Sequence, residues 1–160
     1  MATGTPAVIA LAAAGVRFTL HEYEHDPAST DFGREAAAAL GVDPMRIFKT
    51  LVVDIGTDRP QLAVGVVPVA GMLDLKAIGR ELGVKRATMA DPKQAAASSG
   101  YIVGGISPIG QKNPLPTIID ETAELFDTVF VSAGKRGLQV ELPPADLAAI
   151  TGGKFADIAR

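Results

Sequence analysis

Cysteine and tryptophan are absent from this 160-residue chain. Without cysteine the protein can form no disulfide bond and can supply no thiolate of its own, either as nucleophile or as metal ligand. Histidine occurs only at His21 and His25. On one extended strand these side chains would lie about 13 Å apart, at about 3.3 Å per residue, which is too far to share a metal ion. We therefore expect a protein that uses neither a metal ion nor a cofactor.

Long apolar runs are also absent. No segment approaches the ~18 apolar residues that cross a bilayer, and the apolar run at residues 9–14 is too short, with too little flanking positive charge, for a secretory signal. We therefore expect a cytoplasmic protein that does not bind membranes. The net charge of −3 argues against a broad nucleic-acid surface, and so against DNA as a partner, but it is compatible with a local basic patch.

What is present is the composition of a folded protein. Hydrophobic residues make up 48% of the chain and charged residues 21%, which excludes a disordered chain. A chain of this length can bury a substantial core. No linker, internal repeat or low-complexity tract interrupts it, so we expect one domain that spans residues 1–160.

Helix signals alternate with strand signals. Thr5-Pro6 and Asp91-Pro92 each combine a capping side chain with proline at the first helical position. Helices are predicted over residues 7–14, 32–40, 75–82, 92–99 and 145–150. Strands are predicted over residues 17–25, 50–55, 61–67, 101–103, 117–119, 128–131 and 137–142.

The order of these elements indicates the fold class. Strands outnumber helices and do not follow a strict βαβ order. The connection from Ile55 to Gln61 is too short for a parallel crossover, so some strands must pair antiparallel. We expect an α+β fold with a mixed, strongly curved or barrel-like sheet and flanking helices. Periodicity alone does not decide whether the sheet closes into a barrel.

A glycine- and proline-rich loop is the most informative segment. Residues 101–116 read YIVGGISPIGQKNPLP. Glycine permits positive φ and close approach of a ligand, while proline stiffens the backbone. Such a loop is either an ordinary turn between strands or a rigid segment whose N–H groups face a ligand.

The second informative segment is Phe48-Lys49-Thr50-Leu51, where one lysine opens an apolar strand. Lys49 is either a surface lysine or a fixed positive charge that faces a phosphate or an oxyanion. The nearby chemistry is limited to hydroxyl groups, and the sequence contains no HExxH, Walker A or dinucleotide motif and no clear nucleophile–base pair. A site of this kind suits a labile bond that needs positioning rather than a strong nucleophile.

These segments belong to a wider set of short motifs that occur in order along nearly the whole chain. The motifs are TLHEYEHDP (19–27), FKTL (48–51), PVAG (68–71), LDLK (73–76), MADP (89–92), GYIVGGISPIGQ (100–111), LPTIID (115–120) and VSAGKRGL (131–138). In this set the chain resembles the YbaK/EbsC family, the free-standing relatives of the editing domain of bacterial prolyl-tRNA synthetase. The long glycine loop and VSAGKRGL are most similar to its Cys-tRNA(Pro) deacylase branch.

The resemblance implies a trans-editing hydrolase that removes cysteine from tRNA(Pro). Lys49 would orient the substrate through the 3′-terminal adenosine phosphate or the ester, while the loop amides would stabilise the oxyanion. Tyr23, Thr50 and Ser132 would line the pocket with hydroxyl groups. The implied loop residues are Gly104, Gly105, Ile106, Ser107 and Pro108. In this family the thiol of the substrate cysteine attacks its own ester carbonyl, which agrees with the missing nucleophile–base pair.

The chain departs from the family pattern at two positions. Gln139 stands where relatives often carry aspartate, and Phe48 stands where tyrosine is common. The first change removes a charge and the second removes a hydroxyl group near Lys49. Both changes leave the lysine and the loop intact, so they bear on substrate preference more than on activity.

The resemblance also implies two partners, the acceptor end of tRNA(Pro) and prolyl-tRNA synthetase, which would supply tRNA specificity. Candidate phosphate contacts are Lys85-Arg86, Lys112 and Lys135-Arg136, although each could equally be an ordinary surface cation. Two alternatives to Cys-tRNA(Pro) editing remain open. One is a water-based deacylase of Ala-tRNA(Pro) or another misacylated tRNA, and the other is a module that binds a nucleotide or a tRNA end without turnover.

Overall fold

The computed structural model describes residues 4–160. Its helices are α1 (Pro6–Ala13), α2 (Phe32–Leu40), α3 (Leu75–Glu81), α4 (Pro92–Ser99), α5 (Pro144–Thr151) and the short 3-10 helix η1 (Glu121–Leu125). Its strands are β1 (Thr19–Glu22), β2 (Phe48–Asp54), β3 (Leu62–Pro68), β4 (Thr88–Met89), β5 (Thr117–Asp120), β6 (Val129–Lys135), β7 (Leu138–Leu142) and β8 (Lys154–Ala156). No helix within these residues is long and apolar enough to cross a membrane.

Capping residues set the helix bounds where the sequence predicts them. Asp31, Asp74 and Asp91 each accept a hydrogen bond from a backbone N–H in the first turn of α2, α3 and α4. Gly41 and Gly100 end α2 and α4 in the left-handed conformation, which glycine adopts without steric strain. These local signals fix where the helices start and stop, and two of the helices, α2 and α4, begin beside the cavity described below.

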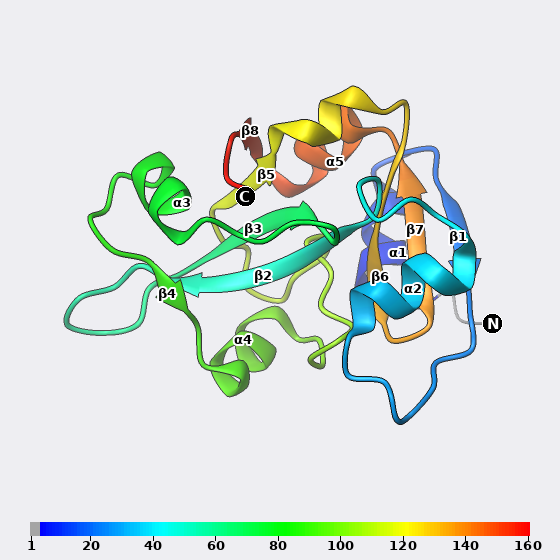
Figure 1. Cartoon of the computed structure of the whole chain (residues 1–160), viewed down its shortest axis with the longest axis horizontal. Coiled ribbons are helices and arrows are strands. Elements are labelled where there is room, and N and C mark those ends of the chain that lie inside the picture. The colour runs from blue at the N-terminus through cyan, green and yellow to red at the C-terminus, as the bar shows by residue number, and fades with distance from the viewer. Residues whose placement is uncertain (1–3) are drawn as a thin grey trace.

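The strands form two sheets, shown side by side in Figure 1. The smaller sheet has the order β1-β7-β6 and is antiparallel. The larger has the order β4-β2-β3-β5-β8, in which β2 pairs antiparallel with β3 and β4, while β3–β5 and β5–β8 are parallel. The predicted α+β class with a mixed sheet is therefore confirmed, and within residues 4–160 the strands divide between two sheets rather than closing into one barrel.

The two sheets meet at the segment that precedes β2. Ile47 and Phe130 form an isolated parallel bridge, and the Phe130 N–H donates to the Arg46 carbonyl at 3.1 Å. The Val69 N–H donates to the Ile47 carbonyl at 2.9 Å from the other side. One short stretch of chain thus connects β6 of the smaller sheet to the end of β3 in the larger one.

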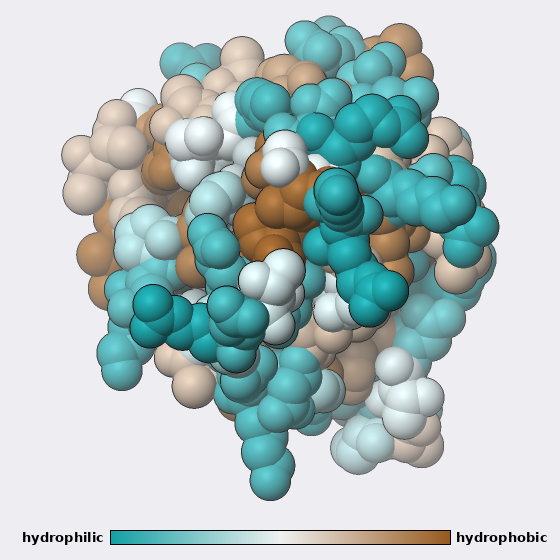
Figure 2. All heavy atoms as spheres, turned by 90° about the vertical axis from the view of Figure 1, so that its left-hand side faces the viewer, coloured by the Kyte–Doolittle hydropathy of each residue, from teal (hydrophilic) through white to brown (hydrophobic). Residues whose placement is uncertain are grey.

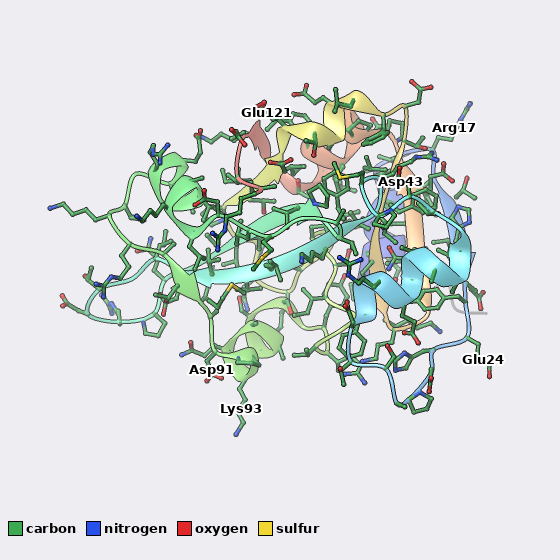
Figure 3. All side chains as sticks on the ribbon, in the orientation of Figure 1. Arg17, Glu24, Asp43, Asp91, Lys93 and Glu121 are labelled. Carbon is green, nitrogen blue, oxygen red and sulfur yellow. The ribbon has the colours of Figure 1, made fainter. Side chains whose placement is uncertain are left out.

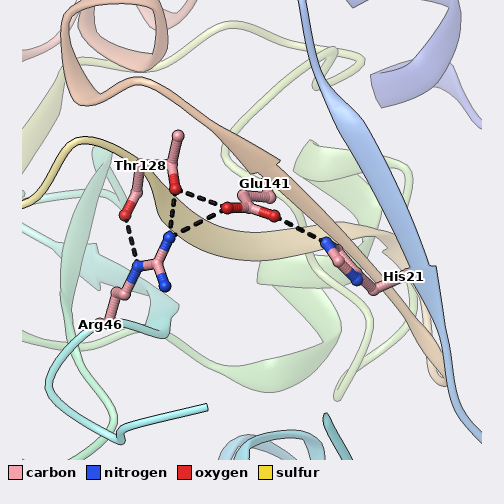
Figure 4. Close-up of polar contacts among 4 residues, drawn as sticks. All are labelled: His21, Arg46, Thr128 and Glu141. Carbon is pink, nitrogen blue, oxygen red and sulfur yellow. Dashed lines mark hydrogen bonds and ion pairs between the residues drawn. The ribbon is translucent and has the colours of Figure 1, made fainter. Parts of the chain in front are cut away.

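A polar network reinforces this junction (Figure 4). Glu141 on β7 accepts from the Thr128 hydroxyl at 2.6 Å, forms an ion pair with Arg46 at 3.0 Å and contacts His21 at 2.9 Å. The Thr128 hydroxyl is the largest influence on the pKa of Glu141, which lies below its usual value; burial opposes this effect, and His21 and Arg46 add to it. The Arg46 guanidinium also lies over the Phe130 ring, 5.1 Å from its centre.

The buried side chains form three clusters. The largest contains Leu11 of α1 and Leu147 of α5 against the smaller sheet, the second contains Ile78 of α3, and the third contains Ala36 of α2 with Ile47. All five side chains are fully buried. Burying one leucine or isoleucine contributes about 1.5–3 kcal/mol relative to leaving it exposed. The third cluster holds α2 against the junction between the sheets.

Four details of the sequence prediction need correction. The strand predicted over residues 101–103 is wrong, because the buried Tyr101 anchors a loop by donating its hydroxyl to the Ile109 carbonyl at 2.6 Å. Burial raises the pKa of this phenol to about 12. Strands β4 and β8 and the helix η1 were not predicted, since β4 and β8 are two and three residues long and form by pairing with distant strands.

Candidate active site

A cavity of about 410 Å³ opens where β2, the start of α2, the β4–α4 connection and the glycine loop meet. Its size is within the range of about 300–1,000 Å³ that is typical of small-molecule sites. Its wall is built from residues 30–33 and 47–52, from four residues between Met89 and Ala95, and from Val69, Val103, Gly104, Ile106, Ser132 and Gln139. Segments far apart in sequence therefore create one site.

Lys49 is the only basic residue in this wall within the described chain. It lies on β2 opposite Val67 of β3, and its side chain is half-buried. Burial lowers the pKa of the Lys49 ammonium below its usual value; the Asp31 carboxylate opposes this effect and Arg34 adds to it. Among residues 4–160 no carboxylate lies within ion-pair distance of Lys49. The cavity thus contains a cation with no ion-pair partner.

Asp31 is an acidic residue in the same cavity wall as Lys49. Asp31 was not identified from the sequence as part of the site. It is exposed at the cavity wall, caps α2 through the Arg34 N–H and forms an ion pair with Arg34 at 3.7 Å. The only sequence signal was its position as a helix cap, which places it where α2 meets the cavity. A carboxylate with these two roles is held in place, although it remains in contact with solvent.

The glycine loop presents its first residues to the cavity. Gly104 and Ile106 line it, and Gly104 has a φ of +88°, in the left-handed region that favours glycine. The Gly105 N–H is used within the loop, where it donates to the Ile102 carbonyl at 2.9 Å. Neither the Gly104 nor the Ile106 N–H group donates to an acceptor within residues 4–160, so both are free to donate to a ligand.

The next two loop residues turn away from the cavity. Ser107 is fully buried, and its hydroxyl oxygen accepts from the Ile109 N–H at 3.1 Å. Pro108 is buried as well. Together with the bond from Tyr101 to Ile109, these contacts make residues 107–109 the rigid base of the loop rather than part of the cavity wall.

The opposite wall comes from the smaller sheet, where Ser132 of β6 is paired in register with Gln139 of β7. Gln139 is buried, with 8% of the residue exposed, and its amide oxygen has no hydrogen-bond partner within the described chain. The Thr50 hydroxyl, in the same cavity, is also buried and unpaired. A buried polar group without a partner destabilises a fold by about 1–3 kcal/mol, so these two groups leave hydrogen-bonding capacity beside the cavity that the described residues do not use.

Five of the nine predicted site residues are brought together by the fold, and four are not. Those that line the cavity are Lys49, Thr50, Gly104, Ile106 and Ser132. Those outside its wall are Tyr23, Gly105, Ser107 and Pro108. Tyr23 neighbours Gln139 outside the wall: burial raises the pKa of its phenol, Gly137 and Gln139 oppose that effect, and Glu35 adds to it.

Both histidines lie outside the cavity wall, and each contacts a carboxylate. His21 pairs with Glu141, and His25 pairs with Glu35 at 2.7 Å. No cluster of three or more histidine, aspartate or glutamate side chains with metal-binding geometry occurs between residues 4 and 160.

Comparison with known proteins gives a consistent result. The family model for the aminoacyl-tRNA editing domain matches residues 26–150. The chain is 41% identical over 138 residues to EbsC of Enterococcus faecalis (strain ATCC 700802 / V583), named as a Cys-tRNA(Pro)/Cys-tRNA(Cys) deacylase; the match covers 86% of this chain and 83% of EbsC.

Two solved structures have the same fold. One is described as a trans-editing enzyme for prolyl-tRNA synthetase, with a TM-score of 0.81, 28% identity and coverage of 97% of this chain and 95% of that one. The other is the hypothetical protein APE2540, with a TM-score of 0.81, 26% identity and coverage of 94% and 96%. The fold, the cavity and these matches confirm the family resemblance seen in the motifs: the chain belongs to the aminoacyl-tRNA editing domain family.

Proposed function

We propose that this protein is a trans-editing deacylase that hydrolyses the ester bond of Cys-tRNA(Pro). The relative EbsC, 41% identical, is named as a Cys-tRNA(Pro)/Cys-tRNA(Cys) deacylase. The observation that carries the proposal is the pairing of an unpartnered cation, Lys49, with the unbonded N–H groups of Gly104 and Ile106 in one cavity. Such donors stabilise an ester carbonyl that becomes an oxyanion.

A separate site of this kind has a clear purpose. Cysteine and proline are similar in size, and a small difference in shape is worth only about 1–3 kcal/mol to a binding pocket. A synthetase that relies on fit alone therefore makes errors, which a second enzyme removes by hydrolysis.

In the proposed mechanism Lys49 holds the 3′-terminal adenosine phosphate or the ester. The Gly104 and Ile106 amides bind the carbonyl oxygen. Thr50, Ser132 and Gln139 line the wall within reach of the remaining polar groups of the substrate. Tyr23 lies beside the Gln139 side chain, and Gly105, Ser107 and Pro108 give the loop its shape.

The nucleophile is the thiol of the substrate itself. The thiolate attacks the ester carbonyl carbon, the bond from that carbon to the ribose oxygen breaks, and the ribose oxygen takes up the proton that the thiol lost. Water then opens the resulting four-membered thiolactone to give free cysteine. A thiol with a pKa near about 8.5 is partly ionised at neutral pH, and its fixed proximity to the carbonyl supplies much of the rate.

The tRNA would contact a basic segment beside the cavity. Residues 76–93 contain five basic and two acidic residues in a chain whose net charge is −3. The segment includes Lys85 and Arg86 and runs through β4 to the start of α4, where Met89 lines the cavity and Lys93 points away from the body of the protein (Figure 3). It belongs to the side seen in Figure 2, where hydrophilic side chains surround a smaller apolar area. We infer that phosphates of the acceptor stem bind here.

We also propose prolyl-tRNA synthetase as the partner that selects tRNA(Pro), in the cytoplasm. A relative that is 28% identical is described as a trans-editing enzyme for that synthetase. A net acidic chain with one basic segment binds tRNA weakly, so a partner that already holds the tRNA would raise the local substrate concentration. Retention of Cys-tRNA(Pro) by a mixture of both proteins, tighter than by either alone, tests this proposal.

Asp31 supports a second candidate, a water-based deacylase of Ala-tRNA(Pro). A carboxylate at the cavity wall could hold the attacking water as a general base. The Asp31→Asn variant separates the two mechanisms, since thiol attack needs no protein base and water attack does. Asn keeps the N-cap of α2, so the fold is preserved.

The deciding experiment compares Cys-, Ala- and Ser-tRNA(Pro) as substrates for the wild type and for Lys49→Ala. Serine replaces sulfur by oxygen at nearly the same size. Rapid loss of cysteine alone, abolished by the substitution, supports the proposal. Equal hydrolysis of all three substrates favours the water mechanism, and no hydrolysis of any of them contradicts a deacylase.

A further inference from the structure

Arg136, at the turn between β6 and β7, is bound to the glycine loop. Its Nε and one terminal nitrogen both donate to the Val103 carbonyl, at 2.9 and 2.7 Å. The side chain is exposed but has a fixed orientation, because a planar guanidinium that makes two bonds to one oxygen has little freedom to rotate. The sequence suggested Arg136 as a tRNA contact, but its guanidinium already makes hydrogen bonds within the protein.

The same guanidinium makes a second contact, with an aromatic ring. It stacks on the Phe32 ring, 4.7 Å from the ring centre, and Phe32 lines the cavity at the start of α2. The His25 ring lies 5.7 Å from Phe32, and His25 is held by Glu35 at 2.7 Å. Arg136 thus joins the glycine loop to α2 through a chain of packed groups.

The glycines show how closely these parts are packed. A Cβ atom on Gly104 would lie 2.9 Å from both Arg136 Nε and the Phe32 ring. A Cβ atom on Gly105 would lie 2.8 Å from Lys135 Cα. Since such short contacts force atoms to move, any side chain at these two positions would push the loop away from the β6–β7 turn.

The bonded carbonyl belongs to the peptide unit whose nitrogen is the Gly104 N–H. The structure contains no cis peptide bond among its described residues. In a trans unit the C=O and N–H lie in one plane and point in opposite directions, so Arg136 binds one edge of the peptide unit and the Gly104 N–H leaves from the opposite edge. Two charge-assisted bonds to the oxygen also polarise the peptide and strengthen its N–H as a donor.

We propose that Arg136 is a positioning residue that orients and polarises the Val103–Gly104 peptide, so that the Gly104 N–H stabilises the oxyanion. This inference rests on the proposed deacylase function. It makes the β6–β7 turn part of the catalytic apparatus, although Arg136 itself does not touch the substrate. Arg17, between α1 and β1, is also an exposed arginine, makes no ion pair within the described chain and does not line the cavity, so it serves as the matched control.

The test compares Arg136→Ala, Arg136→Lys and Arg17→Ala. Removal of one oxyanion donor reduces kcat by about 10²–10³-fold, so loss of its orientation should reduce kcat by about 10–100-fold. We expect this loss in Arg136→Ala with little change in KM, an intermediate value in Arg136→Lys and no loss of kcat in Arg17→Ala. Added guanidinium ion should restore part of the activity of Arg136→Ala. An unchanged kcat with a raised, salt-sensitive KM would mean that Arg136 contacts tRNA, and would overturn the proposal.

A readout independent of activity separates this inference from the proposed function. In the ¹H–¹⁵N spectrum, Arg136→Ala should shift the Gly104 amide resonance and speed its hydrogen exchange, whereas Arg17→Ala should leave both unchanged. Thermal unfolding of each variant confirms that it is folded, and Arg136→Lys remains available if the alanine variant does not fold. If the wild type fails to deacylate but the Gly104 signal shifts, only the function is wrong. If the wild type deacylates and neither kcat nor the Gly104 signal of Arg136→Ala changes, this inference is wrong.

Discussion

Lys49 and Asp31 line the same cavity with opposite charges, yet they form no ion pair with each other. The Asp31 carboxylate raises the pKa of Lys49, against the larger effect of burial, while its own ion pair is with Arg34 at 3.7 Å. Lys49 therefore keeps a charge that is stabilised only in part, which is the condition in which a cation binds an incoming anion strongly. This relationship underlies the first two predictions.

Replacing Lys49 by methionine should abolish activity without harming the fold. Burial lowers the pKa of Lys49, which means that the folded state disfavours its charge at neutral pH. The variant should lose about 10²–10³-fold in kcat and melt at the same or a higher temperature than the wild type. Steady-state kinetics and thermal unfolding check this. A marked fall in the melting temperature would mean that Lys49 has a structural role instead.

The deacylation rate should pass through a maximum as the pH rises. The rising side follows ionisation of the substrate thiol, near about pH 8.5. The falling side follows loss of the Lys49 charge and, because the pKa of Lys49 is lowered, begins below the usual lysine value of about 10.4. Rates measured under single-turnover conditions from neutral to alkaline pH test this. A curve that rises without a maximum would show that the charge of Lys49 is not needed.

Gln139→Leu should weaken substrate binding while stabilising the protein. The Gln139 amide oxygen is buried without a partner, and removing it relieves a cost of about 1–3 kcal/mol. Leucine has a similar volume, so the cavity is retained. We expect a raised KM together with a raised free energy of unfolding, measured by urea denaturation. The control is Ser132→Ala. Ser132 is paired with Gln139 across the two strands and also lines the wall, so this variant changes the wall without removing the buried amide.

Glu141→Gln should lower the stability of the protein at neutral pH and should make that stability less dependent on pH in the acid range. The pKa of Glu141 is lowered, chiefly by the Thr128 hydroxyl. Its contribution is therefore complete above the unfolded value of about 4.3 and is lost as the pH falls through the lower folded value. The variant should be less stable than the wild type by about 1–2 kcal/mol at neutral pH, and the difference should vanish in strong acid. Equal stability of both proteins at every pH would contradict a role for this network.

Reversing the charges of Lys85 and Arg86 should weaken tRNA binding. The double variant Lys85→Glu with Arg86→Glu should raise KM and make the salt dependence of binding less steep, because fewer counterions are released. Arg17→Glu with Arg59→Glu, at two exposed positions outside this segment, provides the same change of charge elsewhere. The comparison uses binding titrations at several salt concentrations. Identical slopes for wild type and double variant would place the tRNA on another surface.

Local patterns predicted most of the fold. The capping residues and the glycines that end α2 and α4 gave the helix bounds, and the short connection after Ile55 gave the antiparallel pairing of β2 with β3. The strands β4 and β8 could not be found in this way, because so few residues contain no periodicity and their pairing with β2 and β5 is set by tertiary structure.

The candidate site was predictable in part. Lys49 and the glycine loop could be found because their residue types are unusual and match a family motif. The direction of each side chain could not: Ser107 faces the core, and Arg136 is bound to Val103. A loop without a repeating pattern does not encode which of its groups face inward, so its orientation emerges only when the β6–β7 turn packs against it.

The position of the cavity between the two sheets has a consequence for biosynthesis. Lys49 is made early, on β2, while Gln139 is made late, on β7, and their segments meet through the bridge between Ile47 and Phe130. Gln139 is the last residue of the wall, so the wall is incomplete until all of the chain except the end of β7, α5 and β8 has been synthesised. A nascent chain on the ribosome, surrounded by aminoacyl-tRNA, thus has no deacylation site until nearly the whole protein has been made.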